Sequence, residues 1–217
     1  MLEADRLLDM KAGCALAAAG QEARALELYA EGCDLARSSG DEQRLLFAQG
    51  GIAEIHRGRG DFAAAEPIYL QSIEYARQQD DLGALLVRLF NFASLLVATG
   101  RLDEARDALR ESRFAAKRFG YKGFVECATD VVAALASVLG EHAIAARFHG
   151  AMLRQMEEAG ICHDPVDEGF IAPRIAVSRE AMGDAAFEAA LAGGWSLSYE
   201  AAVTELDRWL GVEGPGE

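Results

Sequence analysis

Positively charged side chains are scarce in this chain. Its 217 residues include 21 lysines and arginines against 35 aspartates and glutamates, which gives a net charge of −14 at pH 7. A surface that binds duplex nucleic acid needs a concentrated basic patch. The charge balance therefore argues against direct binding of nucleic acid.

Long apolar runs and leader signals are also missing. Every apolar stretch is well short of the roughly 18 residues that a membrane-spanning helix needs. Met1 leads directly into an amphipathic segment that has no basic leader region. We therefore expect a soluble, cytoplasmic protein with no membrane contact.

Metal-binding and disulfide patterns are absent. His142 and His149 are followed by His163 at a spacing that matches no zinc site, so we expect no metal and no other cofactor. Buried free thiols in a reducing cytoplasm are the expectation for the cysteines. The cysteines lie far apart and form no CxxC pair: Cys14, Cys33, Cys127 and Cys162.

No catalytic constellation is visible. The chain has no nucleophile elbow, no HExxH, no dinucleotide fingerprint and no GxxxxGK[ST] phosphate loop. The acidic pairs Asp80–Asp81 and Glu157–Glu158 fall at expected turns or helix ends, where solvation explains them. We therefore expect a protein that is not an enzyme.

What the chain does have is a 40-residue period. Small and apolar residues recur at fixed distances before and after each repeated glycine, on one face of a helix with 3.6 residues per turn. Each unit is therefore predicted to be a helix, a tight turn at the glycine and a second helix. A glycine marks each unit and an alanine follows five residues later: Gly20, Gly60, Gly100, Gly140, then Ala25, Ala65, Ala105, Ala145.

A second glycine series marks the turns between units. It consists of Gly40, Gly120 and Gly160, with Gln79–Asp81 in the missing slot. Each helix then has about 17 residues, or roughly 25 Å at 1.5 Å per residue. Because no single unit buries its apolar face alone, the units must stack into one core. The predicted fold is an all-α, right-handed solenoid of helical hairpins.

The C-terminal third breaks the period and is predicted to cap the array. We expect one helix from Pro165 to about Met182, a shorter helix over Ala185–Leu191 that ends at Gly193–Gly194, and a last helix over Tyr199–Leu210. The expected organisation is four repeats over residues 1–160, capping helices over 161–210 and a disordered tail over 211–217.

Two resemblances follow from these motifs. The small–Gly–Ala–aromatic–Ala rhythm of Ala53, Gly60, Ala65, Tyr69 and Ala76 resembles the tetratricopeptide repeat, although that repeat usually has about 34 residues. HEAT repeats share the longer period but lack the Gly-to-Ala turn signature. Tetratricopeptide-like repeats imply protein–protein interaction or signal sensing.

The C-terminal segment carries the second resemblance. Residues of about 140–205 are similar to the end of the MalT-like helical arm of bacterial STAND-class ATPase regulators, which include LuxR-type and adenylate-cyclase-linked members. The similarity is carried by the runs Ala145–Met152, Gly183–Gly194 and Leu197–Val203. It implies a non-catalytic sensing arm of a bacterial transcriptional regulator. Because the phosphate loop is missing and little chain follows, we expect a regulatory arm rather than a complete switch.

The first candidate site is a concave groove lined by the first helix of each repeat. It is predicted to bind a peptide, a protein or a small effector, and so to stabilise one arrangement of the array. A Lys/Asn pattern that clamps a carboxylate terminus is missing. The alternative is that these residues simply pack against neighbouring helices. The groove residues are Phe47, Glu54, Arg57, Val87, Phe90, Asn91, Ser94, Val97 and Asp130.

The second candidate site is a basic stripe formed by Arg106, Arg110, Arg113 and Lys117. Their spacing places all four on one helix face, where two preceding repeats have mostly apolar residues. The stripe is predicted to dock an acidic partner surface. The alternative is a solvated face balanced by acids of the same helix.

Three questions stay open at this point. The chain can instead be a stand-alone scaffold that homodimerises through Leu2, Leu7 and Leu8, or a sensor of a small molecule. Gly50–Gly51, in the middle of a predicted helix, allow either the close approach of a neighbour or a bend. The identity of any partner is not encoded in these patterns.

Overall fold

The protein is built from helices alone in the part of the chain that the structure describes. The computed structural model describes residues 21–120, 124–160, 163 and 165–212. Within these ranges the chain forms ten helices and no strand, which confirms the all-α helical repeat solenoid. The helices are α2 (Glu22–Ser39), α3 (Glu42–Gly58), α4 (Phe62–Gln78), α5 (Leu82–Ala98), α6 (Leu102–Phe119), α7 (Phe124–Val138), α8 (His142–Ala159), α9 (Pro165–Met182), α10 (Asp184–Trp195) and α11 (Tyr199–Leu210).

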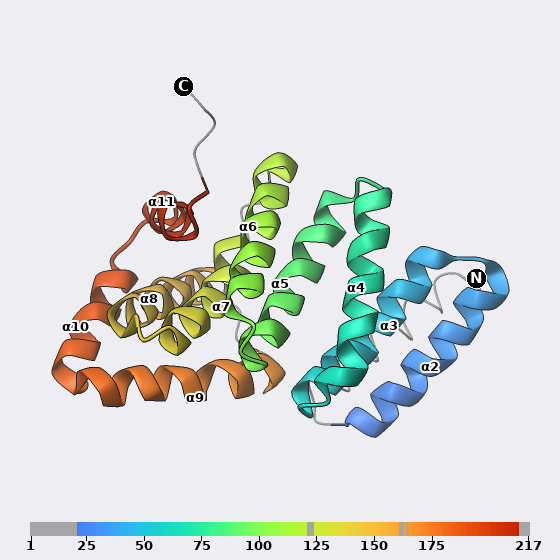
Figure 1. The fold of residues 1–217 in the computed structure, drawn as a ribbon, viewed down its shortest axis with the longest axis horizontal. Helices are drawn as coiled ribbons and strands as arrows, with labels where there is room; N and C mark the ends of the chain where they lie inside the picture. Colours follow the sequence, from blue (N-terminus) through green and yellow to red (C-terminus); the bar gives the residue numbers. More distant parts are fainter. Residues whose placement is uncertain (1–20, 121–123, 161–162, 164, 213–217) are drawn as a thin grey trace.

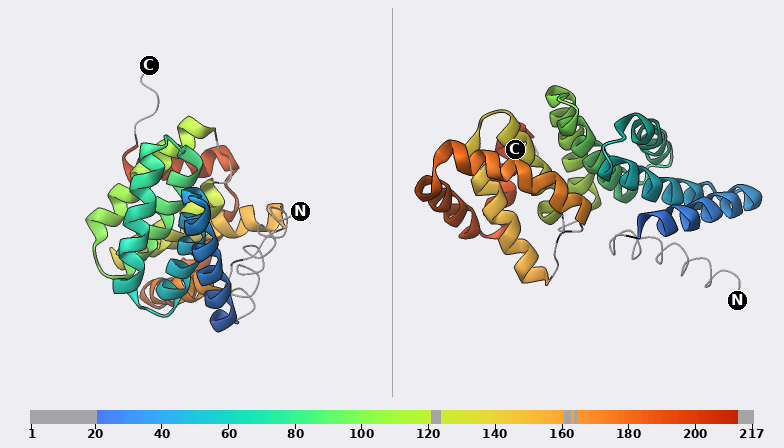
Figure 2. Two further views of the ribbon diagram at one scale, coloured as in Figure 1. Left: turned by 90° about the vertical axis from the view of Figure 1, so that its right-hand side faces the viewer. Right: turned by 90° about the horizontal axis from the view of Figure 1, so that it is seen from below.

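The helices stack side by side into an elongated array. Figure 1 shows α2 and α3 at one end, the hairpins from α4 to α8 in the middle, and α10 and α11 at the other end. The two further views in Figure 2 agree with this arrangement. No helix among the described residues has the length and apolar character needed to cross a membrane.

Short polar residues set where several helices begin. The carboxylates of Asp41, Asp61 and Asp81 each accept a hydrogen bond from the backbone N–H three residues later, at 3.0, 3.3 and 2.9 Å. These bonds satisfy amide groups that have no partner within the helix. The same aspartates therefore fix the entry into α3, α4 and α5.

Both predicted series of turn glycines adopt the left-handed conformation. Within the hairpins and between them φ lies from 67° to 79° at the six glycines that the structure describes. In the slot without a glycine, Asp80 takes the left-handed conformation with φ 50°. Aspartate tolerates this conformation better than most residues with a side chain. The 40-residue period thus continues through a turn that lacks its glycine.

The repeated alanines lie in the packed interior of the array. Ala25, Ala65, Ala105 and Ala145 are all completely buried. The column four residues later is also buried in the first three repeats, at Tyr29, Tyr69 and Leu109. One continuous core runs from α3 to the end of α11, and a smaller cluster joins α2 to α3. Cys33, in the smaller cluster, is a buried free thiol.

Helix α9 does more than follow the repeats. It runs along the lower side of the array in Figure 1, beneath α7 and α8, from its first turn near α5 to its junction with α10. Its first turn reaches α3, where Asp167 accepts a hydrogen bond of 2.8 Å from Arg57. Further along, Ser137 of α7 donates to the Arg174 carbonyl oxygen at 2.7 Å. The C-terminal third therefore packs along the repeats as well as beyond them.

The predicted end of α10 was wrong. The helix continues through Gly193 and Gly194 to Trp195. A Cβ atom on Gly194 would lie only 1.8 Å from the Arg147 carbonyl oxygen, and one on Gly150 only 2.1 Å from the Leu191 carbonyl oxygen. These glycines let the backbones of α8 and α10 touch. Glycine here serves close approach between helices and not helix termination.

The division into four repeats, a cap and a tail stays a prediction. Leu2, Leu7, Leu8 and the first repeat glycine lie outside the described residues, as do residues 213–217. Val212, in the predicted tail, is buried, and its N–H donates to the Asp207 carbonyl oxygen at 2.8 Å.

Candidate functional site

The structure divides the predicted groove into a covered part and an open part. Phe90 is partly buried against the core, and Ser94 and Val97 are buried. Phe47 and Val87 remain 42% and 41% exposed. The other predicted groove residues, Glu54, Arg57, Asn91 and Asp130, take part in the polar contacts described next. The open part of the groove is therefore confined to the region between α3 and α5.

Glu54 is the centre of a partly buried polar network. Its Oε1 atom accepts hydrogen bonds from the Tyr69 hydroxyl at 2.6 Å and from Asn91 Nδ2 at 2.7 Å. Its Oε2 atom accepts two bonds from Arg57, at 3.0 and 2.7 Å. Burial and the Glu54 carboxylate raise the pKa of Tyr69 above its usual range, so the phenol stays a donor. With Asp167 included, this network ties α3, α4, α5 and α9 together.

Asp130 is held by the residue just before α9. His163 places Nε2 at 2.6 Å from an Asp130 carboxylate oxygen and Nδ1 at 3.0 Å from a Glu168 oxygen. The hydrogen bond to Asp130 raises the pKa of His163 to about 9, against the opposing effect of burial. Burial raises the pKa of Asp130, and His163 opposes that rise. Asp130 thus fixes the start of α9 on α7 and is not open to a ligand.

The basic stripe is in contact with the chain's own last helix. Asp207 of α11 accepts hydrogen bonds from Arg113 at 2.5 and 3.0 Å and lies 2.9 Å from Lys117 Nζ. Arg110 donates to the Leu210 carbonyl oxygen at 2.5 Å, and to Asp107 of its own helix at 3.0 Å. The structure therefore supplies an acidic partner for this stripe from within the chain.

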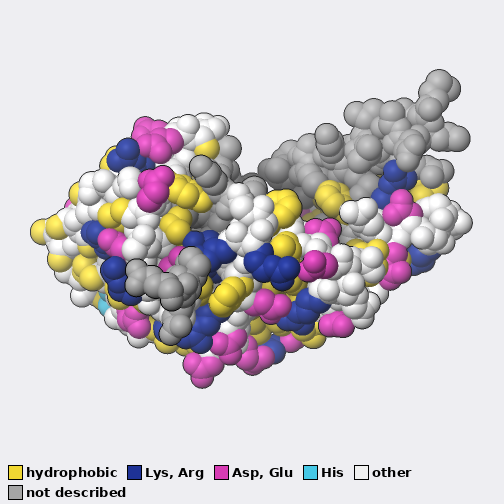
Figure 3. All heavy atoms as spheres, turned by 90° about the horizontal axis from the view of Figure 1, so that it is seen from above, with side chains coloured by type: hydrophobic (Ala, Val, Ile, Leu, Met, Phe, Trp, Pro, Cys, Tyr) yellow, Lys and Arg dark blue, Asp and Glu magenta, His cyan; other side chains and the backbone are white. Residues whose placement is uncertain are grey.

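The remaining member of the stripe, Arg106, contacts an aromatic ring of α11. The Arg106 guanidinium carbon lies 4.4 Å from the centroid of the Trp209 ring, a cation–π arrangement. Trp209 also donates from Nε1 to Glu141 at 2.6 Å. Figure 3, a view from above, shows basic and acidic side chains interspersed on that face of the molecule. Docking of an external acidic surface at the stripe stays a prediction.

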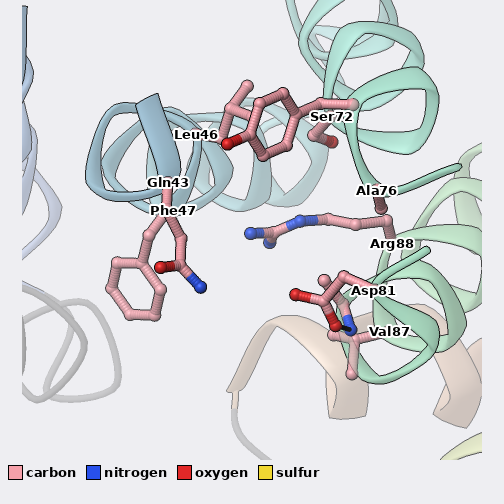
Figure 4. Close-up of a pocket in the computed structure, with 10 residues that line it drawn as sticks. Gln43, Leu46, Phe47, Ser72, Ala76, Asp81, Val87 and Arg88 are labelled. Atoms are coloured by element: carbon pink, nitrogen blue, oxygen red, sulfur yellow. Dashed lines mark hydrogen bonds between the residues drawn. The ribbon is translucent and has the colours of Figure 1, made fainter. Parts of the chain in front are cut away.

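An open pocket lies between α3, α4 and α5. It has a volume of about 270 Å³ and sits near the ends of the hairpins, where α4 turns into α5. Its walls are mainly apolar, and the side chains of Phe47 and Val87 in these walls are exposed to solvent. Figure 4 shows most of the side chains that surround it. They are Gln43, Leu46, Phe47, Ser72, Tyr75, Ala76, Asp81, Ala84, Val87 and Arg88.

Arg88 is the one cation among the described residues that line this pocket. Figure 4 shows its side chain extending from α5 toward Gln43 and Phe47 of α3. No described residue forms a hydrogen bond or ion pair with its guanidinium. Burial lowers the pKa of Arg88, and the more distant Glu54 carboxylate opposes this. An arginine stays protonated at neutral pH nonetheless.

The sequence contained a signal for Arg88, although the predicted groove did not include this residue. In the 40-residue alignment its column otherwise holds Leu8, Ala48 and Ala128. Ala48 is completely buried, which shows that this column faces the packed interior in the second repeat. A single cation in an apolar column marks an unusual position. Arg88 is not among the predicted groove residues because those residues were assigned to a different face of the helix.

The role of Gly50 and Gly51 is now clear. A Cβ atom on Gly51 would lie 2.2 Å from the ring of Tyr29, and one on Gly50 would lie 2.8 Å from Arg88 Nη1. Both glycines therefore make room for a neighbouring side chain. Of the two readings that the sequence left open, close approach is the one that the structure supports.

A second pocket lies between the end of α3 and the start of α9. Its volume is about 320 Å³, and both Arg57 and Arg174 line it. Arg57 is engaged by Glu54 and Asp167. Arg174 stacks on the Phe170 ring with its guanidinium carbon 4.2 Å from the centroid. Among the described residues, no group of three or more metal-ligating side chains is arranged to hold an ion.

Comparison with known proteins bears on the region that contains the open pocket. Residues 44–117, which run from α3 to α6, match the family model of the tetratricopeptide repeat. Comparisons with curated proteins and with solved structures gave no match. Tetratricopeptide repeats generally mediate protein–protein interaction and are typically non-catalytic scaffolds. Residues 44–117 thus form a tetratricopeptide-type repeat region within an all-α helical solenoid.

Proposed function

We propose that this chain is a non-catalytic binding arm that recognises a peptide segment of a partner protein in the pocket between α3 and α5. The observation that carries this proposal is the position of the pocket. It is open, its walls are apolar, and almost all of it falls within the region that matches tetratricopeptide repeats. Two other predicted groove residues, Arg57 and Asp130, are engaged by Asp167 of α9 and by His163.

We further propose that the arm belongs to a bacterial transcriptional regulator of the MalT-like type. Support comes from the residues that carry this resemblance, because they lie together in the fold. Gly150 and Gly194 form the close contact between α8 and α10. Arg147 pairs with Glu205 of α11 through hydrogen bonds of 2.6 and 2.7 Å.

The mechanism that fits this geometry is a shift between arrangements of the array. A segment bound between α3 and α5 contacts two successive repeats, so it favours the spacing of those repeats that suits it best. Helix α9 spans from α3 to α8 and is tied to α3 through Arg57. A change of spacing at the pocket therefore acts on the C-terminal helices as well.

The test is a selection of random peptides on the full chain, followed by calorimetric titration of an enriched peptide. Phe47→Ser removes an exposed pocket side chain and should abolish or strongly weaken binding. Phe114→Ser removes a similarly exposed phenylalanine of α6 outside the pocket and should leave binding unchanged. Equal binding by both variants, or the absence of any enriched peptide, contradicts the proposal.

A small effector is a second candidate ligand for the same pocket. Its volume of about 270 Å³ is close to the lower end of the range for small-molecule sites, about 300 Å³. A metabolite that binds only the folded chain raises the melting temperature in a saturable manner. Such a rise, abolished by Phe47→Ser and kept by Phe114→Ser, would favour the sensor over the peptide-binding arm.

A further inference from the structure

We infer that the pocket between α3 and α5 selects a peptide that carries a glutamate or aspartate beside an aliphatic or aromatic residue, with Arg88 binding the carboxylate. This inference rests on the proposed function, since it specifies the chemistry of the peptide bound there. The partner segment is an acidic one. The acid is assigned to the interior of the segment because the chain lacks the Lys/Asn pattern that clamps a free carboxylate terminus.

The first argument is the state of the Arg88 guanidinium. It has five N–H donors in a planar fork that matches a carboxylate in two-point contact. No described residue accepts a hydrogen bond from it, although the side chain is partly buried. Charge-assisted hydrogen bonds to a carboxylate are shorter and about twice as strong as neutral ones. An acidic side chain is therefore the group that best satisfies the N–H donors of Arg88.

The second argument is that two exceptional residues meet at this point. Arg88 stands in an otherwise apolar column, and Gly50 stands in a column that holds Met10, Phe90 and Asp130 in the other repeats. The Arg88 Nη1 atom lies 2.8 Å from where a Cβ of Gly50 would be. A larger residue at position 50 would displace the guanidinium. The two departures together keep the cation between α3 and α5.

The third argument is the rest of the wall. Leu46, Phe47, Tyr75 and Val87 line the same pocket as Arg88 and supply apolar surface. Such a wall favours an apolar neighbour beside the acid, because burying that side chain removes apolar surface from water. A pocket of about 270 Å³ holds only a short part of a peptide. Recognition is therefore expected to rest on one acid and the residue beside it.

The net charge of the chain opposes the binding of acidic ligands, so attraction of an acidic peptide must come from Arg88 itself. With a net charge of −14 the protein repels acidic ligands in general. Asp81 also lines the pocket and partly offsets the cation, while its carboxylate accepts a hydrogen bond from the Ala84 N–H at 2.9 Å. Asp81→Asn keeps a residue that caps helices well and removes only the charge. This variant therefore gives a test that leaves the fold intact.

The experiment is a selection from a displayed library of random peptides with blocked ends, carried out in parallel on the wild-type chain and on Arg88→Gln. Wild type should enrich peptides with Glu or Asp beside Leu, Ile, Val or Phe, and Arg88→Gln should lose the preference for the acid. For an enriched peptide, replacing its acid by the amide should weaken binding to wild type about tenfold. The same replacement should have no effect on binding to Arg88→Gln. Asp81→Asn should bind the acidic peptide about threefold more tightly.

Each other outcome is decisive. Enriched peptides without an acid preference, or an acid-to-amide effect that persists in Arg88→Gln, overturn the inference but leave peptide binding in place. No enriched peptide at all contradicts the proposed function itself. Binding of 3-phenylpropionate without binding of any acidic peptide also overturns the inference, because the ligand is then a small carboxylate. If Arg88→Gln fails to show the wild-type circular dichroism and melting behaviour, the Asp81→Asn and acid-to-amide comparisons decide.

Discussion

Arg57 of α3 donates a hydrogen bond of 2.8 Å to Asp167 of α9, although the two residues are 110 positions apart in the sequence. The same guanidinium contacts Glu54 one helical turn away, and its side chain is only 4% exposed. This cation therefore joins the second repeat to the C-terminal helices. It also explains why part of the predicted groove is covered.

Replacing Arg57 with alanine should lower the free energy of unfolding by about 3 kcal/mol, because the substitution leaves two carboxylates without their buried cation. Arg59 provides the matched control. It forms an exposed ion pair with Glu22 at 2.7 Å, and pairs of this kind contribute about 1 kcal/mol at most. Urea denaturation followed by circular dichroism measures both variants. Equal losses would show that the Arg57 network does not hold α9 on the repeats.

The neighbouring glycines of α3 should respond in opposite ways to alanine. At Gly51 the new methyl group would meet the ring of Tyr29, which is packed in the cluster between α2 and α3. We expect Gly51→Ala to destabilise the fold by about 2 kcal/mol, since overpacking outweighs the gain of about 1 kcal/mol in helix propensity. At Gly50 the methyl group would meet only the flexible end of Arg88. Gly50→Ala should therefore leave the stability unchanged or raise it by up to about 1 kcal/mol.

Thermal and urea unfolding of the two variants test this contrast. The Gly50→Ala variant should also weaken the binding of an acidic peptide, because the guanidinium must move. A stability loss of similar size in both variants would mean that α3 needs its glycines for a bend of the helix. The close-approach explanation would then fail.

The fold was largely predictable because repetition amplifies weak signals. One buried alanine after a glycine says little, but Ala25, Ala65, Ala105 and Ala145 in one column predicted helix contacts that the structure confirms. The turn at Asp80 was predictable for the same reason, since its neighbours in the period are glycines. Local patterns of this kind depend on residues within one hairpin.

The site was predictable only in part, because it depends on contacts between distant segments. The period identifies Asp130 as a groove position but contains no information that His163 lies against it. It likewise identifies the stripe around Arg113 without showing that Asp207 meets it. Arg88 was detectable as the exception in its column. Its lack of a partner became visible only when the surrounding helices were placed.

His163 should make stability depend on pH in the alkaline range. Asp130 and Glu168 face its ring from α7 and α9, and the contact with Asp130 raises its pKa to about 9. A raised pKa stabilises the fold fully below the unfolded value of about 6.5 and loses this contribution as the pH rises through 9. The stability difference between wild type and His163→Gln should therefore shrink from pH 6.5 to pH 10. A constant difference over that range would contradict a protonated His163.

His149 should act in the opposite direction. Burial lowers its pKa to about 4, with the nearby charge on His163 as a further cause, and its Nδ1 atom is buried without a hydrogen-bond partner among the described residues. The equivalent position in the third repeat is Leu109. We expect His149→Leu to stabilise the fold by about 1 kcal/mol at pH 7, because an unsatisfied buried polar group is removed.

The gain should grow as the pH falls from 6.5 toward 4. In that window the unfolded chain binds a proton at His149 and the folded chain does not, so wild type loses stability that the leucine variant keeps. Urea titrations at pH 7 and pH 5 measure the change. A gain that is smaller at pH 5 than at pH 7 would show that the histidine is charged in the fold.

The contact between α11 and the basic stripe gives the last prediction. Asp207 is 17% exposed and lies against Arg113 and Lys117 of α6, so its carboxylate attaches α11 directly to α6. Asp207→Ala should lower the free energy of unfolding by about 2 kcal/mol and speed amide hydrogen exchange across residues 199–210. Asp103→Ala removes an equal charge from an exposed position of α6 and should do neither. If exchange in α11 is unchanged in Asp207→Ala, the remaining contacts of Glu205, Trp209 and Leu210 are sufficient to hold the helix. If exchange rises only in α11 and the slower amides of α2–α5 are unaffected, then the last helix detaches as a separate unit. Detachment would expose the basic stripe to an acidic surface on another protein. Docking of such a surface at the stripe can then be tested with this variant.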